Sequence, residues 1–236
     1  MTKHAVILAG GKGKRLRPYT VVLPKPLMPI GEYPILEVII RQLAKLGFSH
    51  ITLAVNHQAE LIKAFFGNGS KWNIDISYSL EDQPLGTMGP LKLIDSLPEN
   101  FLVMNGDILT DIHFGNFFEN HVNKKSIFTI SSHRRVEMID YGVLDSKDGV
   151  LTGFREKPKN TYEVSMGIYM VNKKVLQFIP DNTTFGFDHL MLFLLKNNYP
   201  VSVNTFEGLW LDIGRPDDYL EAIEIFDQLK DKILYV

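Results

Sequence analysis

The first half of the sequence alternates short apolar runs, typical of buried strands, with longer amphipathic patterns, typical of helices. The apolar runs are AVILA (5–9), HITLAV (50–55), IDISY (74–78) and FLVMN (101–105). The helical patterns cover 34–47, 58–67 and 87–97, and a glycine ends each of the first two. This alternation predicts an α/β fold: a Rossmann-like, mostly parallel mixed sheet with helices on both faces.

The second half of the chain has a looser pattern. Further strand runs lie at 126–131, 166–171 and 201–204, and a helix is expected from Pro216 to about residue 229. Because no linker, repeat or low-complexity stretch interrupts the sequence, we expect a single domain over 1–236.

Composition and charge narrow the class of protein. The 236 residues are 45% hydrophobic with a net charge of −2, so the chain can bury a large core but lacks the broad basic face of a nucleic-acid binder. No apolar run approaches about 18 residues, and the N-terminus lacks the ordered segments of a signal peptide. The absence of cysteine excludes disulfides and thiolate metal sites. We expect a cytoplasmic protein that binds neither nucleic acid nor membrane.

Positive charge and glycine gather directly after the first strand. Residues 1–31 contain six Lys or Arg and no Asp or Glu. The spacing is not that of a Walker A loop, because Leu8 stands where its first glycine belongs, nor that of a dinucleotide fingerprint, because Leu16 replaces the third glycine. The segment therefore offers a flexible backbone that can approach a polyphosphate, with Arg15 and Lys25 as candidate phosphate-binding side chains. The alternative is a solvated surface loop. The neighbouring lysines, Lys12 and Lys14, are expected only to raise the local potential.

Polar segments follow three of the expected strands. They are the glycine segment, Glu81–Thr87 and Asn105–Asp107. Because ligands bind at the carboxyl ends of the strands in parallel sheets, these segments can converge on one site. Asp107 offers a carboxylate of the kind that Mg²⁺ prefers, although a strand-end aspartate is otherwise a turn residue or helix cap, which is our interpretation of Asp111.

The segment LAGGKGKRLRPYT, followed by LPKPLMPIGEYPIL, resembles the signature of the sugar-1-phosphate nucleotidyltransferases, G-G-x-G-x-R-L-x-P-x-T with a later P-K-P. The resemblance spans nearly the whole chain and looks closest to mannose-1-phosphate guanylyltransferase-like members. It continues through PLGTMGPL (84–91), VMNGDIL (103–109), YGVL (141–144), FREKP (154–158), MGIYM (166–170) and WLDIGRPDDY (210–219).

This resemblance implies an enzyme that joins a nucleoside triphosphate to a sugar 1-phosphate and releases pyrophosphate, by Mg²⁺-assisted in-line attack on the α-phosphate. It implies that Arg15, Lys25 and Asp107 are catalytic, that Asp107 and Asp212 hold Mg²⁺, and that nucleotide-binding and sugar-binding halves cover about 1–125 and 126–236. The implied nucleotide contacts are Leu8, Ala9, Gly10, Gly11, Gly13, Arg15, Glu81, Gly86 and Thr87. The implied sugar-phosphate contacts are Asn105, Gly142, Glu156, Lys157, Ser165 and Gly167.

Base and sugar can be ranked from the side chains. Glu81 falls where the family reads the base, and an ionised carboxylate can accept both adjacent donors of guanine but only one from uracil or thymine. GTP therefore ranks first, with mannose or heptose 1-phosphate. Where the family most often has Asn, this chain has Ser165 followed by Met166, so an unusual sugar is possible. The alternative is a uridylyl- or thymidylyltransferase acting on glucose, N-acetylglucosamine or N-acetylmuramic acid 1-phosphate.

Two hypotheses of other classes stay open. A non-catalytic nucleotide-sugar sensor would be expected to have lost catalytic residues that this chain retains, such as Arg15 and Asp212. A glycosyltransferase commonly has an Asp-x-Asp metal motif, which this sequence lacks. A homo-oligomer is possible, but because the sequence stops after its last helix we expect no assembly through a C-terminal β-helix.

Overall fold

The centre of the computed structural model, which describes residues 2–11, 13–56 and 58–235, is a seven-stranded sheet. Its order is β12 (Val201–Phe206), β8 (Phe128–Met138), β11 (Lys159–Asn172), β6 (Asn100–Asn105), β1 (Lys3–Leu8), β4 (Phe48–Val55) and β5 (Asp75–Leu80). The β1, β4, β5 and β6 strands run parallel, as does the β8–β12 pair, whereas β11 is antiparallel to both of its neighbours. The predicted mostly parallel mixed sheet is confirmed.

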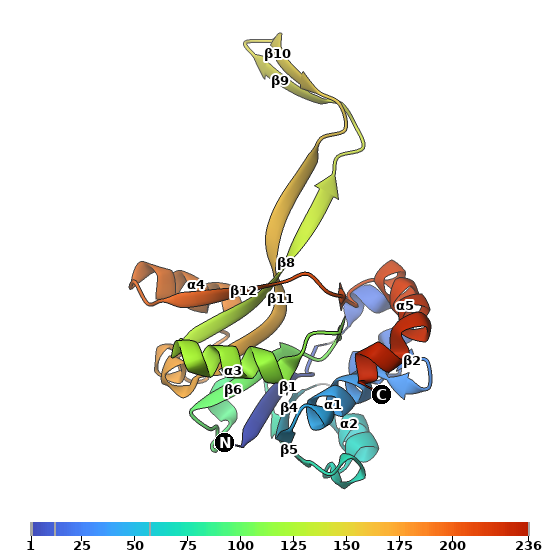
Figure 1. Ribbon diagram of the computed structural model, residues 1–236, viewed down its shortest axis with the longest axis vertical. Coiled ribbons are helices and arrows are strands. Elements are labelled where there is room, and N and C mark those ends of the chain that lie inside the picture. The colour runs from blue at the N-terminus through green and yellow to red at the C-terminus, as the bar shows by residue number, and fades with distance from the viewer. Residues whose placement is uncertain (1, 12, 57, 236) are drawn as a thin grey trace.

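Helices cover both faces of this sheet (Figure 1), as the alternation predicts. Ile7 of β1 faces a core formed with α1 (Ile35–Lys45), α2 (Ala59–Phe66) and α3 (Phe114–Lys124). Its neighbour Val6 faces the opposite core, which includes α4 (Phe187–Lys196) and the 3₁₀ segments η5 (Gly89–Leu93) and η6 (Lys173–Phe178). Successive strand residues therefore serve opposite layers.

A third core joins the N-terminal loop to the end of the chain. Leu16 and Ile30 from the loop pack with Ile213 and Phe226, so α5 (Pro216–Leu234) is held against the loop. The loop contains the 3₁₀ turns η1 (Lys14–Leu16), η2 (Tyr19–Val21) and η3 (Lys25–Leu27), and the short pair β2 (Pro29–Ile30) and β3 (Tyr33–Pro34). Lys12, one of the two lysines expected only to raise the potential, lies outside the described residues.

The expected helix over 87–97 is instead the short 3₁₀ segment η5. The backbone bonds of the segment span three residues, from Leu91 N to Met88 O at 3.2 Å and from Ile94 N to Leu91 O at 3.5 Å, as in a 3₁₀ turn. The N–H groups of Met88 and Gly89 tie the segment to Phe185 O, at 3.0 and 3.1 Å. A Cβ on Gly89 would also stand 2.8 Å from the Leu85 Cβ. Another 3₁₀ turn, η4 (Ser70–Trp72), follows α2.

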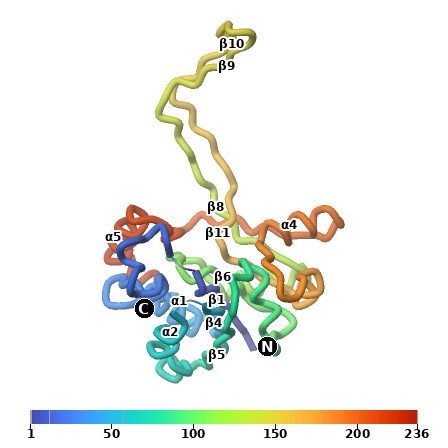
Figure 2. Tube along the Cα trace, turned by 180° about the vertical axis from the view of Figure 1, so that it is seen from behind, coloured from blue at the N-terminus to red at the C-terminus, as the bar shows by residue number. Residues whose placement is uncertain are grey.

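A long hairpin arm projects from the body of the molecule (Figures 1 and 2). The β8 strand pairs with β12 up to His133 opposite Phe206, and beyond that point β11 is its only partner among the described strands. The β9 (Val143–Lys147) and β10 (Val150–Arg155) strands form the antiparallel tip. We call residues 134–163 the arm.

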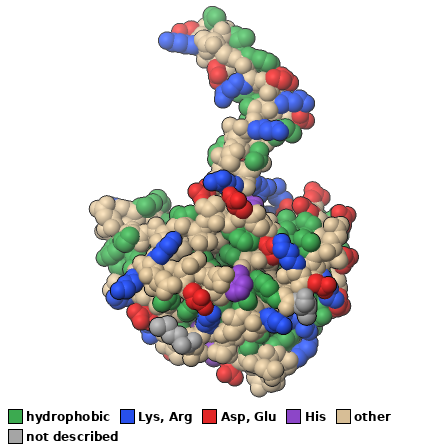
Figure 3. All heavy atoms as spheres, viewed as in Figure 1, with side chains coloured by type: hydrophobic (Ala, Val, Ile, Leu, Met, Phe, Trp, Pro, Cys, Tyr) green, Lys and Arg blue, Asp and Glu red, His purple; other side chains and the backbone are tan. Residues whose placement is uncertain are grey.

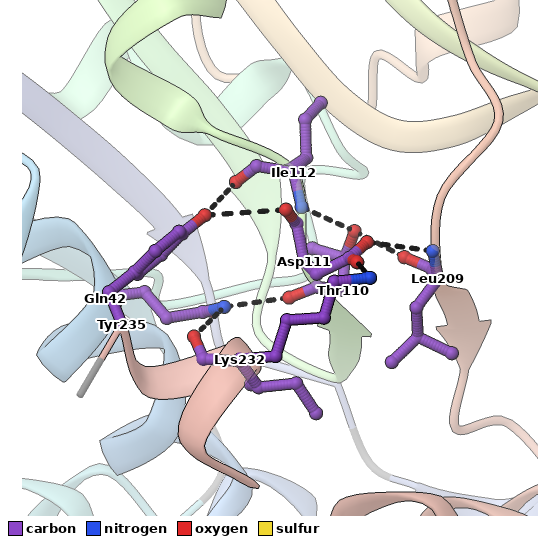
Figure 4. A network of polar contacts seen from close by, with 8 residues as sticks. Gln42, Thr110, Asp111, Ile112, Leu209, Lys232 and Tyr235 are labelled. Atoms are coloured by element: carbon purple, nitrogen blue, oxygen red, sulfur yellow. Dashed lines mark hydrogen bonds and ion pairs between the residues drawn. The ribbon is translucent and has the colours of Figure 1, made fainter. Parts of the chain in front are cut away.

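A small antiparallel pair, β7 (Ile108–Thr110) with β13 (Trp210–Asp212), lies next to the sheet and is locked by a polar network (Figure 4). Asp111 Oδ1 accepts from Leu209 N at 2.7 Å, and the other carboxylate oxygen pairs with Lys232. Gln42 Nε2 donates to Thr110 O at 2.7 Å. Tyr235 OH donates to Ile112 O at 2.8 Å. Asp111 is thus structural, but it binds Leu209 and Lys232 from distant parts of the chain and is not the turn residue or helix cap that we expected.

The described residues include no helix that is long and apolar enough to cross a membrane.

Two buried histidines make the fold sensitive to acid. His121 of α3 contacts Thr129 Oγ1 at 2.8 Å and Asn100 Oδ1 at 3.2 Å. Burial lowers the pKa of His121 to about 4, and burial together with His50 lowers the pKa of His4 to about 4. Because the folded pKa lies below the unfolded value, each histidine contributes stability above about pH 6.5 that is lost as the pH falls toward 4.

We expect the free energy of unfolding to fall by about 2 kcal/mol per buried histidine between pH 7 and pH 5, measured by urea denaturation. His121→Gln should flatten that dependence, because the group that must take up a proton on unfolding is gone. His189→Gln, at an exposed position, is the control and should keep the wild-type slope. Equal slopes in wild type and His121→Gln would contradict the assignment.

Candidate functional site

The glycine loop after β1 is shaped by close backbone contacts. Ala9 N donates to Ala54 O at 2.8 Å, which carries the strand pairing one residue past β1. Gly13 has a φ of 56°, and Thr20 Oγ1 donates to its carbonyl oxygen at 2.7 Å. A Cβ on Gly13 would stand 2.9 Å from Thr20 Cγ2. Glycine is required there because the loop adopts a left-handed turn and folds back on itself.

The loop places Lys25 against the end of β6. Lys25 is only 8% exposed, and its Nζ contacts Asp107 Oδ2. Asp107 Oδ1 is buried and has no hydrogen-bond partner among the described residues. A buried charged oxygen is costly to leave unpaired, so this position suits a cationic ligand.

The β7–β13 pairing brings Asp212 beside Asp107. Ile213 N donates to Asp107 O at 3.0 Å, and Asp212 stands opposite Ile108 in the register. Burial raises the pKa of the Asp212 carboxyl and the charge of Asp107 adds to the shift, whereas Lys25 and Arg15 oppose it. The two carboxylates therefore lie close enough to repel each other, and a cation bound by both would relieve that repulsion.

A polar hollow of about 410 Å³ opens on the Asp212 side. Arg15 borders it, and a Cβ on Gly214 would stand 3.3 Å from Arg15 Nη2. Three further arginines line the hollow that the sequence did not identify as site residues: Arg134, Arg135 and Arg215. Arg215 lies in the segment 210–219 that resembles the family, which is a signal that could have identified it. No local signal marked Arg134 and Arg135, because they lie on β8 and only the tertiary structure brings that strand to this hollow.

A second cavity, of about 260 Å³, opens on the Asp107 side. Of the predicted contacts it is lined by Leu8, Ala9, Gly11, Lys25, Glu81, Gly86, Thr87, Asn105 and Asp107. Gly10 adjoins it, since a Cβ there would stand 3.1 Å from Glu81 Oε1. Asp107, two residues beyond the carboxyl end of β6, thus lines this cavity, and Asp212, at the end of β13, lines the other.

Glu81 lies deep in the second cavity. Its Oε2 accepts from Leu85 N at 3.1 Å, and burial raises the pKa of the carboxyl while that backbone donor opposes the shift. Gly86 has a φ of 81°, and a Cβ there would stand 2.8 Å from Phe185 O. Thr87 Oγ1 accepts from Phe187 N at 2.8 Å, so the first residue of α4 holds this wall of the cavity.

The six predicted sugar-phosphate contacts separate into two groups. Asn105, Ser165 and Gly167 lie at the body: a Cβ on Gly167 would stand 2.6 Å from Asn105 Nδ2, and Gly167 N donates to Ser165 Oγ at 3.3 Å. The β11 strand is irregular there, between Ser165 and Tyr169. Met166, the bulky departure from the family pattern, is buried, and its carbonyl oxygen accepts from Trp210 Nε1 at 3.0 Å.

The other three residues of the set, Gly142, Glu156 and Lys157, are exposed on the arm. Gly142 lies beside Glu156, because a Cβ on Gly142 would stand 3.3 Å from Glu156 Oε2. Lys157 Nζ pairs with Asp140 Oδ1 at 2.8 Å. At about 3.3 Å per strand residue, the start of β11 at Lys159 lies roughly 25 Å along the strand from Gly167. The structure therefore does not bring these three residues to the two hollows.

Comparisons with known proteins point to one family. The family model described as nucleotidyl transferase matches residues 4–228. The D-glycero-alpha-D-manno-heptose 1-phosphate guanylyltransferase of Aneurinibacillus thermoaerophilus is 34% identical over 225 residues, which cover 93% of this chain and 96% of that protein. The UTP--glucose-1-phosphate uridylyltransferase of Synechocystis is 32% identical over 240 residues, and the match spans 93% of this chain but only 62% of that protein.

The fold also matches a solved structure. HddC from Yersinia pseudotuberculosis, complexed with GMP-PN, superimposes with a TM-score of 0.74 at 28% identity, covering 95% of this chain and all of that one.

The glycine loop offers a matched pair of substitutions. Gly13→Ala should lower the free energy of unfolding by about 1–3 kcal/mol, because the left-handed backbone and the Thr20 contact are both incompatible with a Cβ. Gly11→Ala should change stability by less than about 0.5 kcal/mol, because a Cβ there meets no atom within 4 Å among the described residues. Urea denaturation measures both, and equal losses would contradict this description of the loop.

Proposed function

This chain belongs to the nucleotidyl transferase family, and we propose that it joins GTP to a manno-configured sugar 1-phosphate with release of pyrophosphate. The observation that carries the proposal is the pairing of Lys25 with Asp107 in the wall of one hollow, with Asp212 and Arg15 in the wall of the other. In the proposal, the hollow that Glu81 lines takes the base of the nucleotide, and the hollow that Arg15 and Asp212 line takes the phosphates that depart.

The proposed chemistry needs charge neutralisation and alignment rather than a covalent intermediate. The two substrates together bring about six negative charges at neutral pH, so without cationic groups they repel each other. In our proposal Lys25, held on the stiff Pro24–Pro26 backbone, contacts the α-phosphate, and Arg15 holds the leaving β- and γ-phosphates. The attacking sugar phosphate then lies in line with the departing pyrophosphate.

Asp107 and Asp212 would hold Mg²⁺, which supplies further charge neutralisation at the phosphates when bound. The residues fit that ion: both donors are carboxylates, and Asp107 Oδ1 has no hydrogen-bond partner among the described residues. No group of three or more His, Asp or Glu side chains poised for a metal occurs in the described part of the chain. The remaining ligands would therefore be phosphate oxygens and water, as is usual for Mg²⁺.

Glu81 supports guanine as the base. Its Oε1 lies beside Gly10 in the cavity wall, and a carboxylate there can accept from the two adjacent donors of guanine. The heptose relative is named a guanylyltransferase and HddC was solved with GMP-PN, which both agree with GTP. The alternative is UTP, in agreement with the Synechocystis relative, because Glu81 can also accept from the single ring donor of uracil.

For the sugar, we propose heptose 1-phosphate first and mannose 1-phosphate second, since the name of the heptose relative describes the same manno ring. Asn105, Ser165 and Gly167 form the part of the sugar subsite that the body supplies. A sensor that binds the same ligands without turnover would have no need of the two opposed carboxylates that this chain keeps beside Lys25.

The test is a matrix of five triphosphates (ATP, CTP, GTP, UTP and dTTP) against sugar 1-phosphates, read as pyrophosphate release. The sugars are heptose, mannose, glucose, N-acetylglucosamine and N-acetylmuramic acid. We expect release to be greatest with GTP and a manno-configured sugar. Binding without pyrophosphate release in every pair would favour the sensor.

In the same matrix, Glu81→Gln should lower kcat/KM for GTP by about 10- to 100-fold, because an amide offers one acceptor in place of two charged ones. The loss with UTP should be smaller, since uracil needs only one acceptor. An unchanged ranking of the bases would contradict the assignment of Glu81.

Arg15→Ala should lower kcat/KM by an amount equivalent to about 2–4 kcal/mol of transition-state stabilisation, as for loss of one strong electrostatic donor. Arg17→Ala is the matched control, because Arg17 has the same charge in the same loop but lines neither hollow.

Asp107→Asn and Asp212→Asn should abolish turnover while circular dichroism shows an intact fold. Asp217→Asn, at an exposed position on α5, is the control and should keep turnover. Full activity in Asp107→Asn and Asp212→Asn would overturn the metal assignment.

A further inference from the structure

The arm exposes an unusual amount of apolar surface, which no other described part of the chain covers. Tyr141, for example, is 78% exposed. The large exposed apolar side chains of the arm are Val136, Met138, Ile139, Tyr141, Leu144, Val150, Leu151, Phe154 and Tyr162. At roughly 100 Å² each they present about 900 Å², close to the roughly 800 Å² per partner of a standard interface.

The outer strand edges of the arm also lack partners among the described residues. Beyond His133, the described strands leave β8 and β11 as a two-stranded ribbon with two open edges. Such a ribbon is marginally stable alone and presents rows of free backbone donors and acceptors to another strand. The arm therefore needs a partner that offers both apolar surface and backbone pairing.

The charges of the arm indicate what kind of partner fits. Residues 134–163 contain six Lys or Arg and six Asp or Glu. Figure 3 shows acidic, basic and hydrophobic side chains interspersed along the arm. Nucleic acid or an anionic membrane would require an excess of positive charge, whereas a surface of balanced charge can be complementary to a second copy of itself.

The root of the arm borders the site. His133, Arg134, Arg135 and Val136 line the same hollow as Arg15 and Asp212. The fifteen residues from Arg134 to Asp148 span up to roughly 50 Å when extended, which exceeds the about 18 Å radius of gyration expected for a chain of this size. An arm that crosses a two-fold axis near its root therefore reaches across the hollow of the other copy.

We propose that two copies of this chain pair through their arms, and that the tip of each arm closes the sugar side of the other copy's site. The tip then supplies Gly142, Glu156 and Lys157 to the sugar subsite of Asn105, Ser165 and Gly167 in the other copy, which they do not reach within their own chain. The proposed pairing rests on the exposed apolar side chains, the unpaired strand edges and the balanced charge of the arm. The delivery of the tip rests in addition on the function proposed above.

Sedimentation velocity of the full chain tests the pairing without any substrate. We expect a dimer for the wild type, and a monomer for Leu144→Glu and for Val136→Glu, because each substitution places a charge on the apolar surface of the arm. Leu192→Glu and Leu195→Glu, at equally exposed apolar positions on α4, are the matched controls and should remain dimeric. A monomeric wild type, or arm variants that stay dimeric, would overturn the pairing.

Mixing two inactive variants tests the delivery of the tip. Asp107→Asn removes a site carboxylate from the body and leaves the arm unchanged. Lys157→Ala removes a site cation from the arm and leaves the body unchanged. If the arm acts on the other copy, each mixed dimer regains one complete site, so an equimolar mixture that has exchanged subunits should recover about a quarter of wild-type activity. Activity no higher than the mean of the two parents would overturn delivery in trans, as would full activity of Lys157→Ala alone.

The two experiments separate the two proposals. If no substrate pair in the matrix releases pyrophosphate, the proposed function fails while sedimentation still decides the pairing. If the wild type is active and dimeric but the mixture shows no recovery, the proposed function and the pairing stand and the shared site is rejected.

Discussion

The arrangement of the site depends on the antiparallel pairing of β7 with β13. These two short strands come from distant parts of the chain, and their register sets Asp212 opposite Ile108, one residue from Asp107. The pairing is supported by the network around Asp111, Gln42 and Tyr235. A structural carboxylate at Asp111 therefore supports the strands that carry the two carboxylates of the site.

Bringing two carboxylates together has an electrostatic cost, and the surrounding residues offset it in different ways. Lys25 is buried by the loop and contacts Asp107 directly, whereas Arg15 acts on Asp212 from the rim of the hollow. Burial still raises the pKa of Asp212, so the protein alone does not fully compensate the charge. This residual imbalance is what a divalent cation and its phosphate ligands would balance in the proposed reaction.

The body and the arm obey different physical constraints. In the body, alternate residues of each strand face two separate cores, and helices or 3₁₀ segments cover both. The arm has neither core nor covering layer, yet it carries half of the predicted sugar contacts. The proposed partner would cover the exposed apolar side chains of the arm, and the proposed shared site would require an arm of this length.

The sequence by itself determined the α/β alternation, the tight glycine loop and the placement of Glu81 and Asp107 at strand ends, because each depends on local periodicity or backbone freedom. Resemblance to a family, rather than any local pattern, indicated Asp212 as the second carboxylate. Only the tertiary structure decided that Arg134 and Arg135 border the site, that 89–93 is a 3₁₀ segment, and that Gly142, Glu156 and Lys157 stand apart on the arm. These outcomes depend on pairings and contacts between residues far apart in the chain, such as Phe185 with Met88 or β8 with β11, and local sequence patterns carry no information about them.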